Sequence, residues 1–339
     1  MNFLINGYFG YANAGDEAVL AAMLAHLRLL DSLSSFTATS GDPAGTRKMH
    51  GIGAIGRQNP RELLKAIRRC DVFLSGGGSL VQDVTSVRNA VYYTTLLRTA
   101  KTFGKPTMVY AQGVGPLKTP TARKVARRAF QGAKVVTVRD PDSAKLLREI
   151  GVTRAVEITA DPVWDLASAP DAPTQSGEWI AALRAWPGHG EDAVKRLVMA
   201  IKAEADAQGK TLRFLAMQTG VDDVLLRSLV SEEEILDTRD LHPRDIIARM
   251  AGAERVLAMR LHALIFAASV GVPVVAFDYD PKVKALANII GAPLVASPSD
   301  SDLKELPRLI AEARAPSSAA LETLKSKARR NAELAARLK

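Results

Sequence analysis

The chain has 339 residues and a formal net charge of +9, with 47% hydrophobic and 24% charged residues. This length allows two domains of ordinary size. A single cysteine, Cys70, excludes an internal disulfide framework, and no apolar run approaches the roughly 20 residues of a membrane span. The first residues predict a strand and a glycine turn instead of a signal peptide, so we expect a cytoplasmic protein.

The positive charge is unevenly placed along the chain. Residues 1–168 hold 22 Lys and Arg against 13 Asp and Glu, whereas residues 169–339 hold 23 of each. Such a basic half is typical of proteins that meet nucleic acid, anionic lipid or a phosphorylated substrate, and a merely solvated basic surface is the alternative. Nucleic acid is disfavoured because aromatic residues make up only 5% and do not interleave with the basic runs.

The first half alternates short apolar runs with amphipathic segments. This alternation predicts a parallel sheet with right-handed crossovers. Polar, glycine-containing loops follow the strands, and the carboxyl ends of parallel strands meet at one edge, where ligands bind. The strands are predicted at 3–5, 36–39, 72–74, 106–110, 135–138 and 156–159. The helices are predicted at 17–30, 60–69, 89–103, 121–131 and 143–150, with loops at 7–17, 42–57 and 75–83.

A second α/β unit follows a linker predicted at 169–177. Its strands are predicted at 179–183, 212–217, 234–236, 256–259, 272–277 and 294–297. Its helices are predicted at 192–207, 223–229, 243–251, 264–270 and 301–313. A last helix at 317–338 is expected to pack back on the first unit, and a helix lying on a membrane surface is the alternative.

The stretch from Val256 to Lys282 combines the features of a ligand site. It predicts a strand, a tight polar corner, a helix apolar on nearly every side, and a second buried strand. Arg260 and His262 lie at the corner, at a strand end beside a helix N-terminus, which indicates an anionic ligand and proton transfer. A capped helix with a satisfied histidine is the alternative.

Eight motifs, in order along residues 3–290, together resemble the polysaccharide pyruvyl transferase family, and most closely its CsaB-type cell-wall branch. They are Asn13-Ala-Gly-Asp-Glu17, Ser75-Gly-Gly-Gly-Ser-Leu-Val-Gln-Asp83, Gln112-Gly-Val-Gly-Pro116, Val138-Arg-Asp140, Ala160-Asp-Pro162, Leu183-Arg-Ala-Trp186, Arg260-Leu-His-Ala263 and Tyr279-Asp-Pro-Lys282.

The resemblance implies an α/β fold of the glycosyltransferase-B-like kind, with two Rossmann-like domains facing across a cleft. The domains are expected at 1–168, on the acceptor side, and 178–315, on the donor side, followed by a C-terminal helix at 316–339. The implied reaction transfers pyruvate from phosphoenolpyruvate to a sugar, releases phosphate and leaves a cyclic 4,6-ketal. The implied acceptor is an N-acetylmannosamine unit of a lipid-linked cell-wall polymer precursor, and the product serves to anchor surface-layer proteins.

The donor residues implied by the resemblance are Arg139, Arg260, Leu261 and His262. An arginine fork suits both the carboxylate and the phosphate of phosphoenolpyruvate, although Arg139 has a surface pair with Asp140 or Asp142 as its alternative. Ketal formation needs a proton on the methylene carbon of the donor. Since an imidazole titrates near neutrality, we expect His262 to be the general acid.

The acceptor hydroxyl needs a base or a hydrogen-bond acceptor. Asp16 is the expected catalytic base, with Glu17 as a second candidate and helix capping as the alternative role of both. The backbone amides of residues 76–78 are candidates for a phosphate nest, or else the glycines let an acceptor approach closely. The expected acceptor-binding set is Asn13, Asp16, Glu17, Gly77, Gly78, Ser79, Gln82 and Asp83.

No cofactor and no metal are expected, because the histidines are scattered and phosphoenolpyruvate is a co-substrate. His26, His50, His189 and His242 are expected to be structural. The basic first half suits the diphosphate of a lipid-linked acceptor and the anionic inner face of the cell membrane, so a peripheral location is expected. No nucleic-acid partner is expected, and a homo-oligomer is left open. The rival hypotheses are a nucleotide-sugar glycosyltransferase, a UDP-sugar 2-epimerase of similar fold, and a non-enzymatic membrane scaffold.

Overall fold

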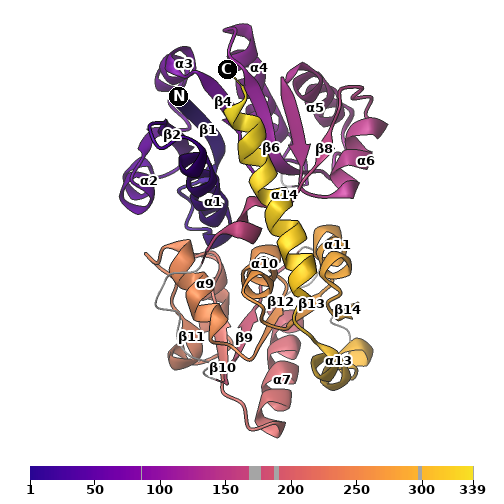
Figure 1. The fold of residues 1–339 in the computed structure, drawn as a ribbon. Helices are drawn as coiled ribbons and strands as arrows, with labels where there is room; N and C mark the ends of the chain where they lie inside the picture. Colours follow the sequence, from indigo (N-terminus) through magenta and orange to yellow (C-terminus); the bar gives the residue numbers. More distant parts are fainter. Residues whose placement is uncertain (85, 168–176, 187–190, 297–299, 339) are drawn as a thin grey trace. The chain divides into compact units, whose positions relative to one another are not determined.

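The computed structural model describes residues 1–84, 86–167, 177–186, 191–296 and 300–338. They form two compact units, shown in Figure 1. Unit 1 consists of Met1–Tyr11, Asp16–Leu166 and Thr323–Lys339, and unit 2 consists of Ala12–Gly15 and Ala167–Glu322. The linker predicted at 169–177 lies outside the described residues except for Gly177.

Unit 1 contains an eight-stranded sheet in the order β3-β2-β1-β4-β6-β7-β8, with β5 beside β6. Its paired strands all run parallel, and Ile5 of β1 faces Ala38 in β2 and Leu74 in β4. The strands are β1 (Asn2–Phe9), β2 (Ser35–Ser40), β3 (Gly53–Gly56), β4 (Val72–Ser75), β5 (Gly78–Val81), β6 (Thr107–Val114), β7 (Val135–Val138) and β8 (Glu157–Ile158).

The helices of unit 1 begin with a recurring sequence pattern, in which a capping side chain precedes a proline. Asp42, Asn59, Thr119 and Asp140 each accept a hydrogen bond from the first turn of the helix that follows. Proline fits the next position, since its fixed φ suits a helix and its missing N–H is not needed there. The helices are α1 (Ala14–Leu30), α2 (Pro43–His50), α3 (Pro60–Arg69), α4 (Val87–Thr102), α5 (Pro120–Gly132), α6 (Pro141–Glu149) and α14 (Ser318–Ala336).

Three predicted loops of unit 1 contain regular structure. The loop predicted at 7–17 is shorter than expected, because β1 extends to Phe9 and α1 begins at Ala14. The prediction of a loop at 42–57 is wrong, because α2 and β3 occupy these residues. Asp42 caps the helix, and Gly51 ends it with φ +62°, in the left-handed region. Only Thr46 and His50 of α2 are buried, so the segment lacks the apolar period that reveals a helix. The loop predicted at 75–83 includes the short strand β5.

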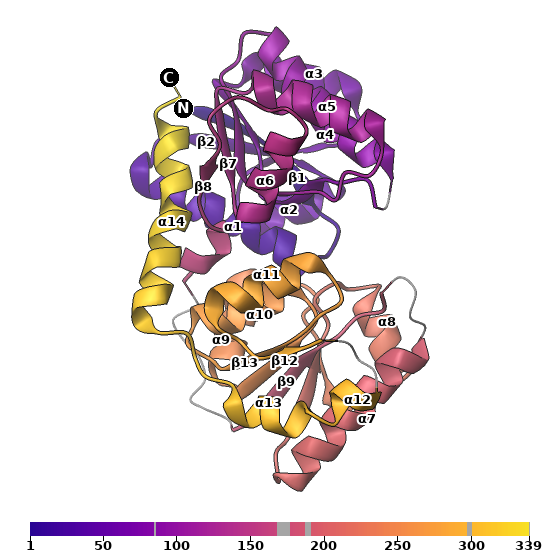
Figure 2. The same cartoon turned by 90° about the vertical axis from the view of Figure 1, so that its right-hand side faces the viewer.

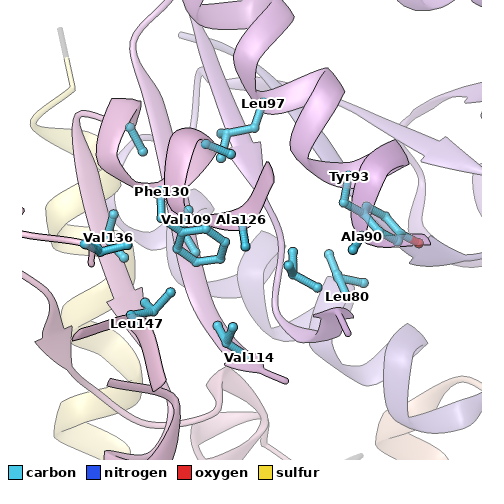
Figure 3. Packing of buried hydrophobic residues seen from close by; sticks show 14 of the residues in the cluster. Leu80, Ala90, Tyr93, Leu97, Val109, Val114, Ala126, Phe130, Val136 and Leu147 are labelled. Carbon is cyan, nitrogen blue, oxygen red and sulfur yellow. The ribbon is translucent and has the colours of Figure 1, made fainter. Parts of the chain in front are cut away.

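The hydrophobic core of unit 1 lies between the sheet and helices α3 to α6. Figure 3 shows Leu97, Phe130 and Leu147 from these helices packed on Val109 and Val136 of the sheet. All five side chains are buried. Burying one such side chain stabilises the fold by about 1.5–3 kcal/mol, so this face holds unit 1 together.

Helix α14 packs on the opposite face of the same sheet. Val136 and Val138 of β7 point into the core just described, so Thr137 between them points the other way. There the Thr137 hydroxyl lies 2.6 Å from Oδ1 of the fully buried Asn331 in α14, and the Thr159 hydroxyl lies 2.8 Å from the same atom. The prediction that the C-terminal helix packs back on the first unit is therefore confirmed.

Unit 2 has a six-stranded parallel sheet in the order β11-β10-β9-β12-β13-β14. Figure 2 shows α9, α10 and α11 on one face of this sheet and α7 and α13 on the other. The strands are β9 (Trp179–Ala182), β10 (Leu212–Leu215), β11 (Ile235–Leu236), β12 (Arg255–Ala258), β13 (Val274–Phe277) and β14 (Leu294–Val295). The helices are α7 (Glu191–Ala207), α8 (Asp222–Arg227), α9 (Pro243–Ala251), α10 (Leu261–Ser269), α11 (Pro281–Ile290), α12 (Asp300–Leu303) and α13 (Leu306–Glu312).

Two differences from the predicted helices of unit 2 have local causes. Helix α11 was not predicted, although Asp280 and Pro281 start it with the same cap-and-proline pattern used in unit 1. The single helix predicted at 301–313 is two short helices, with Pro307 in the first turn of the second. The prediction of a buried helix after Arg260 is confirmed, because every residue of α10 except His262 is buried.

Candidate functional site

Helix α10 presents an uncapped N-terminus directly after strand β12. Arg260 occupies the N-cap position but makes no side-chain capping hydrogen bond, and Leu261 and His262 form the first turn. The first-turn amides and the helix dipole place positive charge at this end. The Arg260 guanidinium lies at the same corner, and together with the first-turn amides it makes the corner suited to an anion.

Arg260 is held by a carboxylate that the sequence analysis missed. Its Nε donates to Oδ2 of Asp222 at 3.0 Å, and its Nη2 donates to Oδ1 of the same side chain. The Asp222 side chain is only 1% exposed, and its Oδ2 also accepts from the amide of Gln218 at 3.0 Å. This two-point pair fixes the guanidinium, and among the described residues no hydrogen bond from Nη1 is found.

Gly15 lets the His262 ring lie against the chain segment that carries the first motif. A Cβ at Gly15 would lie 2.2 Å from Nδ1 of His262, so a larger residue there would displace the ring. Asn13 shapes this segment, because its Oδ1 accepts from the Gly15 amide at 3.0 Å. The segment belongs to unit 2, where Asn13 forms a bridge with Gln218. Gly15 thus contacts both residues, Asn13 through its amide and His262 through the close approach of the ring.

Unit 2 contains one more contact between two of the motifs. The Arg184 guanidinium lies over the ring of Tyr279, 5.7 Å from its centroid. This contact joins the motif at residues 183–186 to the motif at residues 279–282. In the motif at residues 279–282, Asp280 caps α11 and also pairs with Lys282 at 3.2 Å. The polar residues of this motif therefore start a helix.

Arg139 directly follows strand β7 in unit 1 and is surrounded by residues of three other motifs. Its Nη1 donates to Oδ2 of Asp161 at 2.8 Å, and its Nη2 donates to the Ser79 hydroxyl at 3.0 Å. Gly113 makes room for it, since a Cβ there would lie 2.9 Å from Nε and Nη2. The side chain is 6% exposed and Asp161 is 2% exposed, so this is a buried pair instead of the surface pair considered above, and Asp140 is only a distant partner at 3.8 Å.

Asp16 lies against the glycine-rich segment of unit 1. Gly78 has φ +85°, and a Cβ there would lie 3.0 Å from Oδ1 of Asp16. Both the left-handed backbone and the close approach require glycine. Because Ser79 follows Gly78 and contacts Arg139, the structure brings Asp16, Gly78, Ser79 and Arg139 into one region of unit 1.

The phosphate nest predicted at residues 76–78 is only partly available. The Gly76 amide donates to the carbonyl of Asn6 at 2.8 Å, so it is used inside the sheet. At Gly77 a Cβ would lie 2.9 Å from Cγ1 of Val19, which means that this glycine lets α1 pack closely. Three adjacent free amides are therefore not present, and the alternative of close backbone approach fits Gly78 better.

Three residues that were expected to bind the acceptor sugar instead make hydrogen bonds that hold loops in place. Glu17 is buried, and its two oxygens meet the Gly10 amide at 2.7 Å and Nε2 of His50 at 2.8 Å. Oε1 of Gln82 accepts from the Val84 amide at 2.7 Å. The carboxylate of Asp83 accepts from the amides of residues 118 and 119 at 2.7–3.0 Å. Burial alone would raise the pKa of Asp83, but these hydrogen bonds lower it below its ordinary value.

The other histidines have structural surroundings where the structure describes them. His26 lies 3.1 Å from Asp165, and Nδ1 of His242 accepts from the Arg244 amide at the start of α9. His189 lies outside the described residues. Among the described side chains, no group of three or more His, Cys, Asp or Glu is arranged to hold a metal ion. None of the helices in the described ranges has the length and apolar character needed to cross a membrane.

The chain has two parallel-sheet α/β domains, as glycosyltransferase-B-like proteins have, so the predicted α/β fold class with two Rossmann-like domains is confirmed. A UDP-GlcNAc 2-epimerase from Methanocaldococcus jannaschii, solved with UDP-GlcNAc and UDP, has a TM-score of 0.65 and 11% identity, with 98% of this chain and 99% of that chain covered. The UDP-GlcNAc 2-epimerase from Neisseria meningitidis, bound to UDP-GlcNAc, gives 0.64 and 13%, with 98% and 99% covered. At this identity the likeness shows the fold alone.

The amino-acid sequence identifies the protein family, which the fold alone does not. The family model for polysaccharide pyruvyl transferase matches residues 13–281, which include the residues described above from Asn13 to His262. The chain therefore belongs to the polysaccharide pyruvyl transferase family, which supports a transferase that acts with pyruvyl groups. No curated protein matches the sequence.

Proposed function

We propose that the protein transfers pyruvate from phosphoenolpyruvate to two hydroxyls of one sugar, forming a cyclic ketal and releasing phosphate. The observation that carries this proposal is the corner of α10, where Arg260, the Leu261 amide and His262 combine an anion site with a titratable ring. The family match includes this corner. The match also supports a pyruvyl group as the one transferred.

In the proposed reaction, protonated His262 gives its proton to the methylene carbon of phosphoenolpyruvate, which becomes the methyl group of the product. The neighbouring carbon then has oxocarbenium character, and one sugar hydroxyl attacks it while a base takes the hydroxyl proton. The carbon–oxygen bond to phosphate breaks, and inorganic phosphate leaves. A second hydroxyl closes the ring, and its proton leaves with phosphate, so that atoms and charge balance.

The donor contacts are proposed for each unit separately. In unit 2, Nη1 of Arg260 and the first-turn amides of α10 bind the carboxylate or phosphate of the donor, with Asp222 fixing the guanidinium. In unit 1, Arg139 is proposed as a second donor ligand. Its neutral contact with Ser79 is the one that an anion would replace, because the charged pair with Asp161 is stronger.

For the acceptor we propose Asp16 as the group that takes the hydroxyl proton. Its carboxylate is half-buried beside Gly78, where the glycine backbone admits a ligand closely. Asn13, Gly78 and Ser79 remain proposed acceptor contacts. Glu17, Gln82 and Asp83 are left out, because their hydrogen bonds hold loops. Gly77 is left out because it serves the packing of α1.

The proposed acceptor is an N-acetylmannosamine unit of a lipid-linked cell-wall polymer precursor, and the proposed location is the inner face of the cell membrane. The CsaB-type motif set supports this, together with a role in anchoring surface-layer proteins. Helices α3 and α5 offer exposed cations that suit an anionic headgroup surface. These are Arg61, Lys65, Arg68, Arg69, Arg123, Lys124, Arg127 and Arg128.

The membrane proposal is tested by pelleting the protein with vesicles of anionic or neutral lipid. We expect binding to anionic vesicles at low ionic strength and its loss at high salt, since exposed charges are screened. Lys124→Glu should weaken binding, whereas Lys195→Glu, the same change on an exposed residue of unit 2, should not. Absence of binding at low salt contradicts the proposal.

The reaction is tested with phosphoenolpyruvate and a lipid-linked disaccharide acceptor, with free phosphate as the readout. His262→Gln should lower phosphate release by about 10²–10⁴-fold, the usual contribution of a general acid. His242→Gln is the matched control, because it changes a histidine of the same unit that caps α9. Release of uridine diphosphate from a nucleotide sugar, without phosphate release, would instead support a glycosyltransferase or 2-epimerase.

A further inference from the structure

Arg57 lies among four tyrosines in unit 1, and we call these five residues the Arg57 cluster. Its guanidinium carbon is 4.4 Å from the ring centroid of Tyr92, 5.4 Å from Tyr93, 5.6 Å from Tyr11 and 6.0 Å from Tyr8. Tyr8 and Tyr11 stack on each other with centroids 4.3 Å apart. The cluster therefore gathers four of the six tyrosines of the chain around one cation.

The cluster lies at the ligand-binding edge of the unit 1 sheet. Tyr8 is near the end of β1, and Arg57 directly follows β3, so both lie at carboxyl ends of parallel strands. Tyr92 and Tyr93 come from the first turns of α4. Burial is the main cause that raises the pKa of Tyr8 and Tyr93, and the charge of Asp16, the proposed acceptor base, is a lesser one.

Arg57 differs from the two arginines of the candidate site in its charge balance. Arg139 and Arg260 each pair with a buried aspartate, whereas Arg57 is surrounded by tyrosines. Burial acts to lower the pKa of Arg57, but Tyr93, Tyr11 and Tyr92 raise it above its ordinary value. Within the part of the chain that the structure describes, no carboxylate pairs with Arg57. Removing a cation from water without a counter-charge is unfavourable, so a half-buried Arg57 favours an anionic ligand.

A buried hydroxyl gives a second, independent indication of a ligand. Tyr93 is 2% exposed, and its hydroxyl has no hydrogen-bond partner among the described groups. Figure 3 shows Tyr93 at the margin of the core, with this hydroxyl pointing away from the other labelled side chains. An unsatisfied buried hydroxyl is unfavourable, and a hydrogen bond to a ligand oxygen would offset this cost.

The cluster is also held in place by its surroundings. The Tyr92 hydroxyl donates to the Arg57 carbonyl at 3.1 Å. Gly41, after β2, makes room for Tyr11, because a Cβ there would lie 2.5 Å from its ring. The guanidinium and the phenol rings are thus prearranged, and Arg57, Tyr8, Tyr11 and Tyr92 all remain partly exposed.

We propose that the Arg57 cluster binds the diphosphate that joins the acceptor sugar to its lipid. This proposal rests on the proposed function, which supplies a diphosphate-bearing acceptor. Arg57 provides the charge-assisted contact to a phosphate oxygen, and the hydroxyl of Tyr93 provides a neutral donor. The aromatic rings exclude water from the contact and so strengthen it.

The test compares two soluble acceptors that carry the same disaccharide, one on a short-chain alkyl diphosphate and the other on a neutral alkyl group. Arg57→Gln should raise the KM for the diphosphate acceptor by about 10–100-fold, and Tyr93→Phe by about 3–10-fold, as expected for a charged and a neutral hydrogen bond. The KM for the neutral acceptor and for phosphoenolpyruvate should not change. Arg98→Gln, an exposed arginine of α4, is the charge-matched control.

Equal KM increases for both acceptors, or an increase for phosphoenolpyruvate alone, would overturn the proposal and leave the proposed function intact. If the wild type releases no phosphate, the proposed function fails, and calorimetric binding of the diphosphate acceptor without donor still tests the cluster. Weaker binding by Arg57→Gln then supports it, and unchanged binding overturns it. Inorganic pyrophosphate should bind more weakly than the diphosphate acceptor, whereas equal affinity would overturn the assignment to a lipid-linked ligand. Tyr93→Phe retains the ring, so it remains informative if Arg57→Gln folds poorly.

Discussion

Arg139 and Arg260 occupy equivalent places in the two units, each between the end of a parallel strand and a helix, but their surroundings differ. Arg260 is bound through two nitrogens by one carboxylate, and its partner Asp222 is fixed by the nearby Gln218 amide. Arg139 divides its contacts between Asp161 and Ser79, which come from separate segments. The unit 2 arginine is therefore fixed locally, whereas the unit 1 arginine depends on how several loops meet.

The largest expected effect on folding comes from removing the two aspartates. Asp222→Ala leaves Arg260 as a buried, unpaired cation and should lower the free energy of unfolding by about 3–5 kcal/mol. Asp161→Ala should cost less, because Arg139 keeps its contact with Ser79. Denaturant unfolding of both variants, with Asp237→Ala as an exposed control, measures the difference. Equal losses would contradict the contrast between a local and a distributed pair.

A smaller change should separate catalysis from stability in unit 2. Gly15→Ala puts a methyl group where the His262 ring lies, so the ring must move. We expect phosphate release to fall about 10²-fold, the effect of a misplacement of about 1 Å, while the melting temperature changes little. Gly132→Ala is the control, because its methyl would meet only the flexible end of Lys101. Full activity of Gly15→Ala would exclude His262 as the acid in this position.

A substitution in α14 tests whether this helix supports the pair between Arg139 and Asp161. Asn331 donates to the carbonyl of Ala160, the residue before Asp161, and its Oδ1 meets the hydroxyls of Thr137 and Thr159. Asn331→Ala leaves these buried groups without a partner and should lower stability by about 1–3 kcal/mol. Hydrogen exchange should rise in α14 and around Asp161 but not around Asp222. Protection that is unchanged near Asp161 would show that α14 does not support the pair.

The smallest effect is expected at Asp83, which holds the segment that follows Ser79. Its folded pKa is lowered below the unfolded value, so its contribution to stability is present above the ordinary aspartate pKa of about 4. That contribution is lost as the pH falls through the lower folded pKa. Asp83→Asn should therefore lose a little stability at pH 7 and become less sensitive to acid. Parallel stability curves for the variant and wild type between pH 7 and pH 2 would contradict this role.

The sequence was sufficient for the features that depend on neighbouring residues. The corner at Arg260 and the buried helix after it follow from local apolar patterns and strand ends. The packing of the last helix was predicted from its composition, which is rich in Ala, Leu, Lys and Arg. The polar helix α2 and the helix α11 were missed, because a short helix that buries few residues has a weak periodic signal. Their cap-and-proline starts were the signal that was available.

The partners of the two arginines could not be predicted in the same way. Asp161 lies 22 residues from Arg139, and Asp222 lies 38 residues from Arg260. Such pairs are created by the folding of separate loops onto one sheet edge, so no local spacing reveals them. The same reason applies to Gly15 and His262, which belong to different motifs and meet only in the folded unit.

The most direct measurement is the product formed by the full-length protein from phosphoenolpyruvate and a lipid-linked N-acetylmannosamine acceptor. Free phosphate and the mass of the acceptor are followed together, in wild type and in His262→Gln. We expect phosphate in an amount equal to the pyruvyl ketal formed, and formation of both to be about 10²–10⁴-fold slower with His262→Gln. Unchanged acceptor without phosphate release in the wild type, or release of uridine diphosphate from a nucleotide sugar, would contradict a pyruvyl transfer at the Arg260 and His262 corner.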